Sequence, residues 1–318
     1  MPDTLMDSYR FQNALRNDDL AELSKVPKTD LHNHSIFGTR IENIESWVHA
    51  PLRCAPARMA SLDEMRDYAH EVLYPHILTR AGFEFTAESA VRDALTDGVV
   101  LLEMSLDVRF MSLYNTIPDG FLSFVAGLVE AYRGRINFRP EIGISKNRSP
   151  ATEVPLAHIC IGSGLFCSID LYGNETAQPP DAYRNLYAAA KGHGLKLKAH
   201  VGEFAGADLM AQTIDILQLD EVQHGVAAIM STSLMERLRQ ERIRLNICPS
   251  SNVALGIVSD VSVHPIRILI DNGVRVSINT DDLTIFGQSV SQEYLLLYRS
   301  GLLSAETLDF IRRDSLSP

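Results

Sequence analysis

The stretch VPKTDLHNH, residues 26–34, is a short strand-like run that ends in two histidines, His32 and His34. The histidines are two positions apart, so both imidazoles project to the same side of an extended chain. Seven further apolar runs bounded by turn signals follow along the chain: residues 99–109, 137–145, 165–172, 195–200, 221–225, 243–248 and 274–280. The segments between these runs carry the spacing of amphipathic helices. Eight strands that alternate with helices predict an α/β fold, a TIM-type (β/α)8 barrel.

The length of 318 residues suits one such barrel with an insertion, and no repeat or linker-like Gly/Ser tract divides the chain. The sequence therefore predicts a single domain over residues 1–318. Its longest departure from strand–helix alternation is the segment 35–97, which follows the first predicted strand and has an amphipathic helical pattern near residues 62–73. Because long insertions at the C-terminal face of a barrel commonly cover the site there, we expect residues 35–97 to form a helical lid.

The composition excludes several classes of function. The formal net charge is -11 at pH 7, whereas a protein that binds nucleic acid or an anionic membrane needs a basic surface. No apolar run approaches the ~20 residues of a membrane span, and residues 1–19 are too polar for a signal peptide. The cysteines lack metal-binding or redox spacing and are typical of reduced thiols in a cytoplasmic protein: Cys54, Cys160, Cys167 and Cys248. The expected partner is a small molecule, and the composition carries no signal for an oligomeric state.

Polar residues stand at the ends of several predicted strands. His32 and His34 end the first strand, His200 ends the fifth, and Asp281 follows the eighth. In a parallel barrel the C-terminal ends of the strands meet at one mouth, whatever their separation in sequence. Three imidazoles and a carboxylate are ligands that Zn²⁺ accepts while an open position remains for water. The sequence therefore predicts one metal ion at these four residues, and the same ligands also suit Fe or Mn.

Two further polar residues at the same strand ends suit proton transfer. Glu203 follows His200 by three residues, and His224 ends the sixth predicted strand just before Gly225. A single buried histidine is more often a hydrogen-bonded core residue than a ligand, so it is the grouping at strand ends that favours catalysis. The remaining histidines are assigned to the structural class: His49, His70, His76, His158, His193 and His264.

Taken together, these motifs resemble those of the adenosine deaminase family, which belongs to the amidohydrolase superfamily of metal-dependent barrels. The matching segments are TDLHNH (29–34), DGVV (97–100), DLYGNE (170–175), HVGE (200–203), QHG (223–225), CPSSN (248–252) and NTDD (279–282). The resemblance extends from about residue 27 to residue 312. It implies hydrolytic, zinc-dependent deamination of a 6-aminopurine nucleoside, adenosine or a close analogue, to the 6-oxopurine and ammonia.

The resemblance also implies a role for each matching residue. Four residues would bind a single zinc ion: His32, His34, His200 and Asp281. Catalytic roles would fall to Glu203, which would protonate purine N1, to His224, which would take or orient the proton of the attacking water, and to Asp281. Among the residues that contact the substrate, Asp282 would reach N7 and the Gly173 backbone would approach N3. His34 would contact the substrate as well.

The sequence departs from the family pattern after the second histidine. Residues 35–40 read SIFGTR, where members that act on adenosine carry an aspartate that contacts the ribose 5′-hydroxyl. A 5′-modified adenosine, an adenine nucleotide, free adenine or the substrate of another mononuclear hydrolase of the superfamily therefore remain alternatives. Arg40 either faces such a substrate or pairs with Glu42 or Glu45. A non-catalytic binding protein is disfavoured, because the proton-transfer residues are present.

A second departure is Lys198, which lies on the same side of the fifth strand as His200 and so faces the barrel interior. A buried ammonium group is costly unless it is paired. We therefore predict that Lys198 pairs with Glu103 or Glu141 from the second and third strands.

Overall fold

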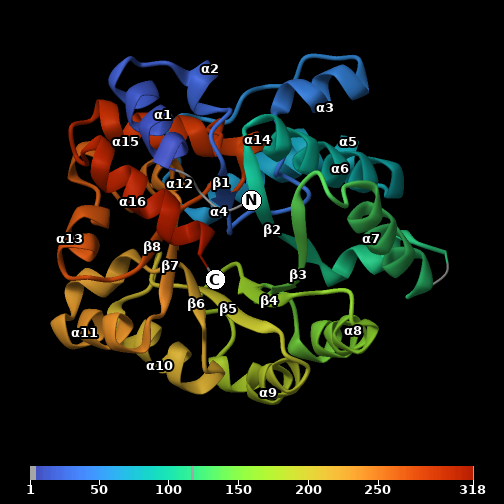
Figure 1. Ribbon diagram of the computed structural model, residues 1–318. Helices are drawn as coiled ribbons and strands as arrows, with labels where there is room; N and C mark the ends of the chain where they lie inside the picture. Colours follow the sequence, from blue (N-terminus) through green and yellow to red (C-terminus); the bar gives the residue numbers. More distant parts are fainter. Residues whose placement is uncertain (1–4, 116–117, 318) are drawn as a thin grey trace.

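The computed structural model describes residues 5–115 and 118–317 and forms a barrel of eight parallel strands (Figure 1). The strands are hydrogen-bonded in chain order: β1 (Lys28–Asp30), β2 (Val99–Asp107), β3 (Asn137–Ser145), β4 (Ser168–Tyr172), β5 (Lys196–Val201), β6 (Glu221–His224), β7 (Arg244–Ile247) and β8 (Val276–Ile278). The ring closes where an isolated bridge pairs Asn33 with Asp281, just beyond the ends of β1 and β8. The predicted α/β barrel is therefore confirmed.

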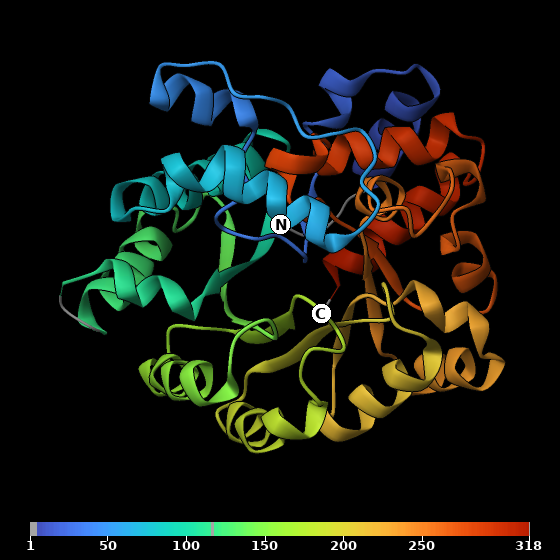
Figure 2. The same cartoon turned by 180° about the vertical axis from the view of Figure 1, so that it is seen from behind.

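Helices surround the strands on the outside of the ring (Figures 1 and 2). The helices that precede β2 are α1 (Leu5–Arg16), α2 (Leu20–Leu23), α3 (Ile41–Val48), α4 (Leu62–Tyr68), η1 (Ala69–Leu73), α5 (Tyr74–Ile77) and α6 (Arg80–Thr96). Those between β2 and β6 are η2 (Val108–Leu113), α7 (Asp119–Ala131), α8 (Pro150–Ser163), η3 (Pro180–Tyr183), α9 (Arg184–Gly192) and α10 (Ala207–Leu217). Those after β6 are η4 (Val226–Met230), α11 (Thr232–Glu241), α12 (Pro249–Ala254), η5 (Val261–Val263), α13 (Ile266–Asp271), α14 (Leu283–Phe286), α15 (Val290–Arg299) and α16 (Ala305–Leu316).

Capping side chains determine where several of these helices begin. The Thr79 hydroxyl accepts a hydrogen bond from the Gly82 amide (3.0 Å) ahead of α6, and Ser289 forms a reciprocal capping box with Gln292 ahead of α15. Each cap satisfies an amide that the first turn of a helix leaves free. None of the described helices has the length and apolar character that a bilayer-spanning helix needs.

The two strands at the closure are shorter than the predicted runs 26–34 and 274–280. After β1 the chain leaves the regular ladder, because the Leu31 amide donates to the Asn279 side chain (2.8 Å) instead of to a neighbouring strand. The two histidines of the opening stretch consequently lie beyond the end of β1, at the mouth of the barrel, rather than within the strand.

The segment 35–97 is helical along much of its length. Its last helix, α6, packs against β2 as part of the outer layer of the barrel. The helix expected near residues 62–73 is α4, which continues into the π-helix η1 just before Pro75. Because proline has no amide to continue an α-helical ladder, a local change of winding is expected there. Of the helices in this segment before α6, α4, η1 and α5 are light blue in Figure 2 and lie over one end of the barrel, whereas α3 lies to one side.

The barrel interior below the mouth contains a buried network of charges. Lys198 is completely buried, and its Nζ lies 2.5 Å from a Glu103 oxygen and 2.8 Å from a Glu141 oxygen. The pairing predicted with Glu103 or Glu141 is confirmed, and it involves both carboxylates. Burial alone would lower the pKa of Lys198, but the carboxylates of Glu103 and Glu141 raise the pKa above its usual value. Lys198 also donates to the Leu31 carbonyl (2.9 Å), directly before the first histidine of the mouth.

Candidate active site

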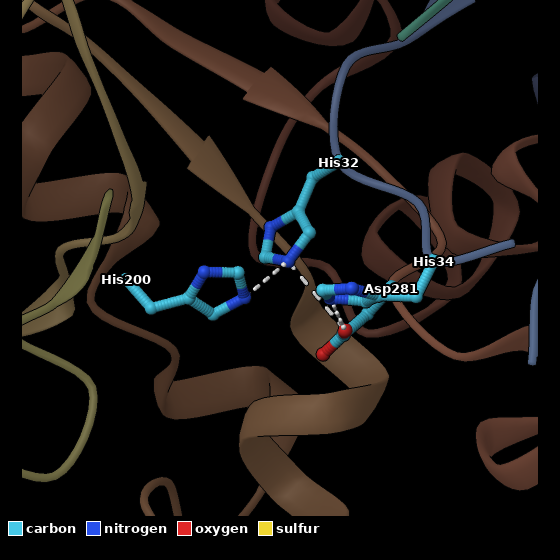
Figure 3. A group of neighbouring side chains, drawn as sticks. All are labelled: His32, His34, His200 and Asp281. Carbon is cyan, nitrogen blue, oxygen red and sulfur yellow. Dashed lines mark hydrogen bonds and ion pairs between the residues drawn. The ribbon is translucent and has the colours of Figure 1, made fainter. Parts of the chain in front are cut away.

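Four side chains from distant parts of the chain meet at the mouth of the barrel (Figure 3): His32, His34, His200 and Asp281. One ligand atom from each lies within 4.8 Å of the others. His32 Nε2 is 3.0 Å from His200 Nε2 and 3.5 Å from Asp281 Oδ1. His34 Nε2 is 3.3 Å from the same Asp281 oxygen. The residues predicted to share a metal ion are therefore brought together.

The donor set fits one divalent cation. Ligands that each lie about 2.0–2.2 Å from a tetrahedral zinc ion are separated from one another by roughly 3.3–3.6 Å. The distances of 3.3 and 3.5 Å between ligand atoms fall in this range, and the 3.0 Å between His32 and His200 is slightly shorter. The imidazole nitrogens and the carboxylate oxygen are also ligand types that zinc accepts.

Neighbouring groups orient two of these imidazoles. His200 Nδ1 lies 3.1 Å from Oδ1 of the buried Asp170, and His32 Nδ1 lies 3.3 Å from the Asn246 carbonyl oxygen. Such contacts leave the Nε2 atoms of both rings directed at the common point, as is usual for metal-binding histidines. Asp170 was not assigned a role from the sequence, although it lies in the matching segment DLYGNE.

Asp281 and His224 adopt left-handed backbone conformations, with φ values of 58° and 61°. Residues other than glycine are uncommon in this region, and when they occur they tend to mark functional sites. At Asp281 the amide donates to the His32 carbonyl (3.0 Å), which ties the two sides of the closure together. The unfavourable backbone conformation therefore occurs in the turns that direct the His224 and Asp281 side chains into the mouth of the barrel.

Glu203 and His224 lie beside the four-residue cluster. His224 Nε2 is 3.5 Å from Glu203 Oε2 and 3.8 Å from Asp281 Oδ2. Burial raises the pKa of Glu203 well above its usual value, and the carboxylate of Asp281 adds to this effect. A protonated carboxyl group at neutral pH can act as a general acid.

Two residues that sequence reasoning left without a role support this pair. The Asn252 amide nitrogen contacts His224 Nδ1 (3.2 Å) and a Glu203 oxygen (3.5 Å). The buried Glu175 carboxylate accepts hydrogen bonds from three backbone amides, those of Gly202 (2.7 Å), Glu203 (3.0 Å) and Phe204 (2.7 Å). Glu175 therefore holds the turn that carries Glu203. The only sequence signal for either residue was its place in a matching segment.

A cavity of about 320 Å³ opens onto this cluster. The lining includes the predicted site residues His34, Gly173, His200, Glu203, His224, Asp281 and Asp282. Gly173 has a φ of +95°, and a Cβ atom there would lie 2.7 Å from the Asn147 side-chain nitrogen, so a larger residue would strain the backbone and have to displace the Asn147 side chain. Burial raises the pKa of Asp282 to about 7.

The outer wall of the cavity differs from the polar floor. Its apolar residues are Ile36, Phe37, Leu62, Met65, Phe110 and Leu255, and its basic residues include Arg66, Arg109 and Arg148. His70, which was assigned to the structural class, also lines the cavity. Arg40 is not among the lining residues, and its guanidinium contacts the Gln292 side-chain oxygen (3.5 Å).

Comparisons with known proteins agree with the geometry. Residues 59–317 match the family described as adenosine deaminase. A putative adenosine/adenine deaminase from Treponema pallidum (strain Nichols) is 34% identical over 289 residues, 90% of this chain and 97% of that protein. An adenine deaminase from Rhodospirillum rubrum is 35% identical over 282 residues, 85% of this chain and 84% of that protein. The fold is similar to that of an amidohydrolase from Burkhoderia ambifaria with bound Zn, with a TM-score of 0.74 at 19% identity, over 98% of this chain and 87% of that one.

Proposed function

The chain belongs to the adenosine deaminase family of hydrolases that act on C–N bonds, and we propose that it deaminates a 6-aminopurine nucleoside, adenosine or a close analogue. The products would be the 6-oxopurine and ammonia. One observation carries the proposal. Glu203, His224 and Asp282 line the same cavity as three members of the cluster, His34, His200 and Asp281, so groups that could serve as acid, base and ring contacts share one cavity.

The four residues of the cluster would hold a zinc ion, as the bound Zn in the relative of the same fold supports. The chemistry that the ion supplies is Lewis acidity, which makes water acidic enough to act as a nucleophile near neutral pH. His224 would accept or orient the proton of the attacking water. Its Nε2 lies on the side that faces Glu203 and Asp281, which is where a water molecule would have to be positioned.

Glu203 would supply the other half of the proton transfer. C6 of an aminopurine is a poor electrophile, and a proton placed on N1 prevents negative charge from accumulating on the ring during attack. The raised pKa of Glu203 favours the protonated carboxyl that this step requires. Asp282 would bind the N7 edge, and the Gly173 backbone would approach the ring near N3, where the absence of a side chain leaves room.

We further propose that the chain forms one domain, residues 1–318, in which the segment 35–97 covers the site as a lid. In support, this segment contributes part of the cavity wall, including Leu62, His70 and Tyr74. Tyr74 stacks on Phe37 with a 5.7 Å centroid separation, which joins the helical segment to the loop after β1. Closure of such a segment would exclude water from the substrate.

Free adenine is a second candidate substrate. The wall position next to His34, where adenosine-specific members would place an aspartate, is occupied by the apolar side chains of Ile36 and Phe37. Neither side chain can accept a hydrogen bond from a ribose hydroxyl. The adenine deaminase activity named for the Rhodospirillum rubrum relative favours the same alternative.

The two candidates are separated by the loss of aminopurine ultraviolet absorbance with adenosine, adenine and AMP in parallel. We expect measurable kcat/KM for adenosine or adenine. A preference of about 100-fold or more for adenosine would support the nucleoside, because a site that pairs with the ribose rejects a substrate without it, and a preference for adenine would support the free base. Ammonia release is the control for hydrolysis. If the metal-loaded protein turned over none of the three compounds, the proposed activity would be wrong.

Removal of the metal ion is expected to abolish turnover. Dialysis against a chelator should lower kcat below detection, and addition of one equivalent of Zn²⁺ should restore it, because the apoenzyme has no group that makes water nucleophilic at neutral pH. Metal content measured by atomic emission should change in parallel, from about one ion per chain to none. Full activity in a chain without metal would contradict the mechanism.

A further inference from the structure

A second cavity lies at the opposite end of the barrel, where the strands begin. It has a volume of about 240 Å³ and is called the lower cavity below. Its described lining residues are Leu31, Val100, Leu101, Asn137, Arg139, Lys196, Arg244, Ser315, Leu316 and Ser317. The last three belong to the end of the chain, which α16 carries across β1 and β8 (Figure 1). The lower cavity is thus separate from the active site.

Three basic residues line the lower cavity, and no acidic residue is among its described lining residues. Arg139, Lys196 and Arg244 come from β3, β5 and β7, so alternate strands direct a cation to the same end of the barrel. Alternate strands of a barrel commonly contribute side chains to one layer. In a chain with a formal net charge of -11, a cavity with only basic charges is a strong local departure.

The carboxylates that pair with these cations lie deeper in the barrel. Glu103 is 3.3 Å from Arg139 and 3.5 Å from Lys196, and Glu221 is 2.8 Å from Lys196 and 3.4 Å from Arg244. Both carboxylates are also shared with the fully buried Lys198, at 2.5 and 3.9 Å. Glu141 also pairs with Lys198 (2.8 Å), and the Asp314 carboxylate lies 3.9 Å from Arg244, so four carboxylates contact these four cations. None of the four is among the described lining residues of the lower cavity.

Arg244 adds an independent sign of a missing ligand. Its side chain is 5% exposed, and its two terminal nitrogens contact the carboxylates of Glu221 (3.4 Å) and Asp314 (3.9 Å) and the carbonyl oxygens of Asp314 (3.2 Å) and Ser317 (3.3 Å). Its Nε has no hydrogen-bond partner among the described residues. A buried donor without a partner is costly, and a donor attached to a charged group more so.

We propose that the lower cavity binds a small oxyanion of the phosphate type through Arg139, Lys196 and Arg244. A tetrahedral oxyanion has several acceptor oxygens, and guanidinium and ammonium groups form their strongest hydrogen bonds with such acceptors. An anion there would add acceptor oxygens on the cavity side of these cations, where Arg244 Nε has no partner among the described residues.

The test is calorimetric titration of the metal-loaded protein with inorganic phosphate at low ionic strength. We expect saturable binding with a Kd of about 1 mM or tighter. Arg139→Gln should weaken it about tenfold, the effect of losing one charge-assisted hydrogen bond. Lys196→Gln should act similarly and serves as a second variant should the first not fold. Arg135→Gln, the same change at an exposed arginine that is not among the lining residues, should leave Kd unchanged.

Binding at the active site is distinguished by Arg148→Gln, which alters the basic wall of the cavity above the metal cluster. If Arg148→Gln weakens phosphate binding and Arg139→Gln does not, the anion binds at the active site and the inference is wrong. Absence of saturable binding to the unmodified protein would also overturn it. Because the readout is anion binding and not turnover, failure here leaves the proposed deaminase function untouched, and the reverse is equally true.

Discussion

Glu203→Gln is expected to lower kcat for purine deamination by about 10²- to 10⁴-fold, the usual contribution of a general acid or base. The substitution keeps the size of the side chain and its capacity to contact Asn252, but it removes the acidic proton that the raised pKa of Glu203 retains. Steady-state kinetics with the preferred purine, together with metal analysis, would measure the effect. The zinc content is expected to stay at about one ion per chain, because Glu203 is not among the four clustered ligands.

The matched control for this variant is Glu236→Gln on α11, where the carboxylate pairs with Arg239 at the surface. Its kcat should equal that of the unmodified protein. A Glu203→Gln variant that is correctly loaded with metal and retains a near-normal rate would remove Glu203 from the proton transfer. Loss of both metal and rate would instead assign Glu203 to the metal site.

Lys198→Met is expected to lower the thermal midpoint of unfolding by roughly 5–8 °C, which corresponds to about 3–5 kcal/mol for a chain of this size. The ammonium group is completely buried between Glu103 and Glu141, so its removal leaves carboxylates without a counter-charge in the barrel interior. The exposed Lys191, which contacts Gln218 at 2.9 Å, provides the control. Lys191→Met should shift the midpoint by less than about 1 °C.

A double substitution separates charge from packing. Adding Glu141→Gln to Lys198→Met removes one of the uncompensated carboxylates, so part of the lost stability should return. Differential scanning calorimetry of the four variants of this cycle measures the coupling directly. Equal midpoints for the single and double variants would show that Lys198 contributes packing rather than charge compensation.

The barrel was predictable because its signals are local and repeated. Each strand is an apolar run with turn residues at its ends, and parallel strands joined by helices have few alternative arrangements. The pairing of Lys198 was predictable for a related reason, since a charge on the interior side of a strand requires a partner that another strand directs into the same interior. The lengths of β1 and β8 were not predictable, because a side-chain contact, Leu31 with Asn279, ends the ladder at the closure.

The cluster of His32, His34, His200 and Asp281 could also be predicted from the sequence, since its members stand at strand ends that converge in any parallel barrel. The residues and backbone conformations around the cluster could not be predicted. Tertiary contacts impose the left-handed backbone conformation at His224 and Asp281, and the conformational preferences of these residue types do not predict it. The same holds for Glu175, whose carboxylate reaches across to the turn after β5 to bind three amides. Such contacts depend on side-chain positions that only the folded chain defines.

The central claim, that one divalent ion is shared by four residues at the barrel mouth, is tested most directly by anomalous diffraction at the zinc absorption edge from crystals of the metal-loaded protein. The account predicts a single peak at about 2.0–2.2 Å from His32 Nε2, His34 Nε2, His200 Nε2 and an Asp281 oxygen. A peak coordinated elsewhere, or a fully loaded crystal in which these four side chains bind no metal, would contradict it.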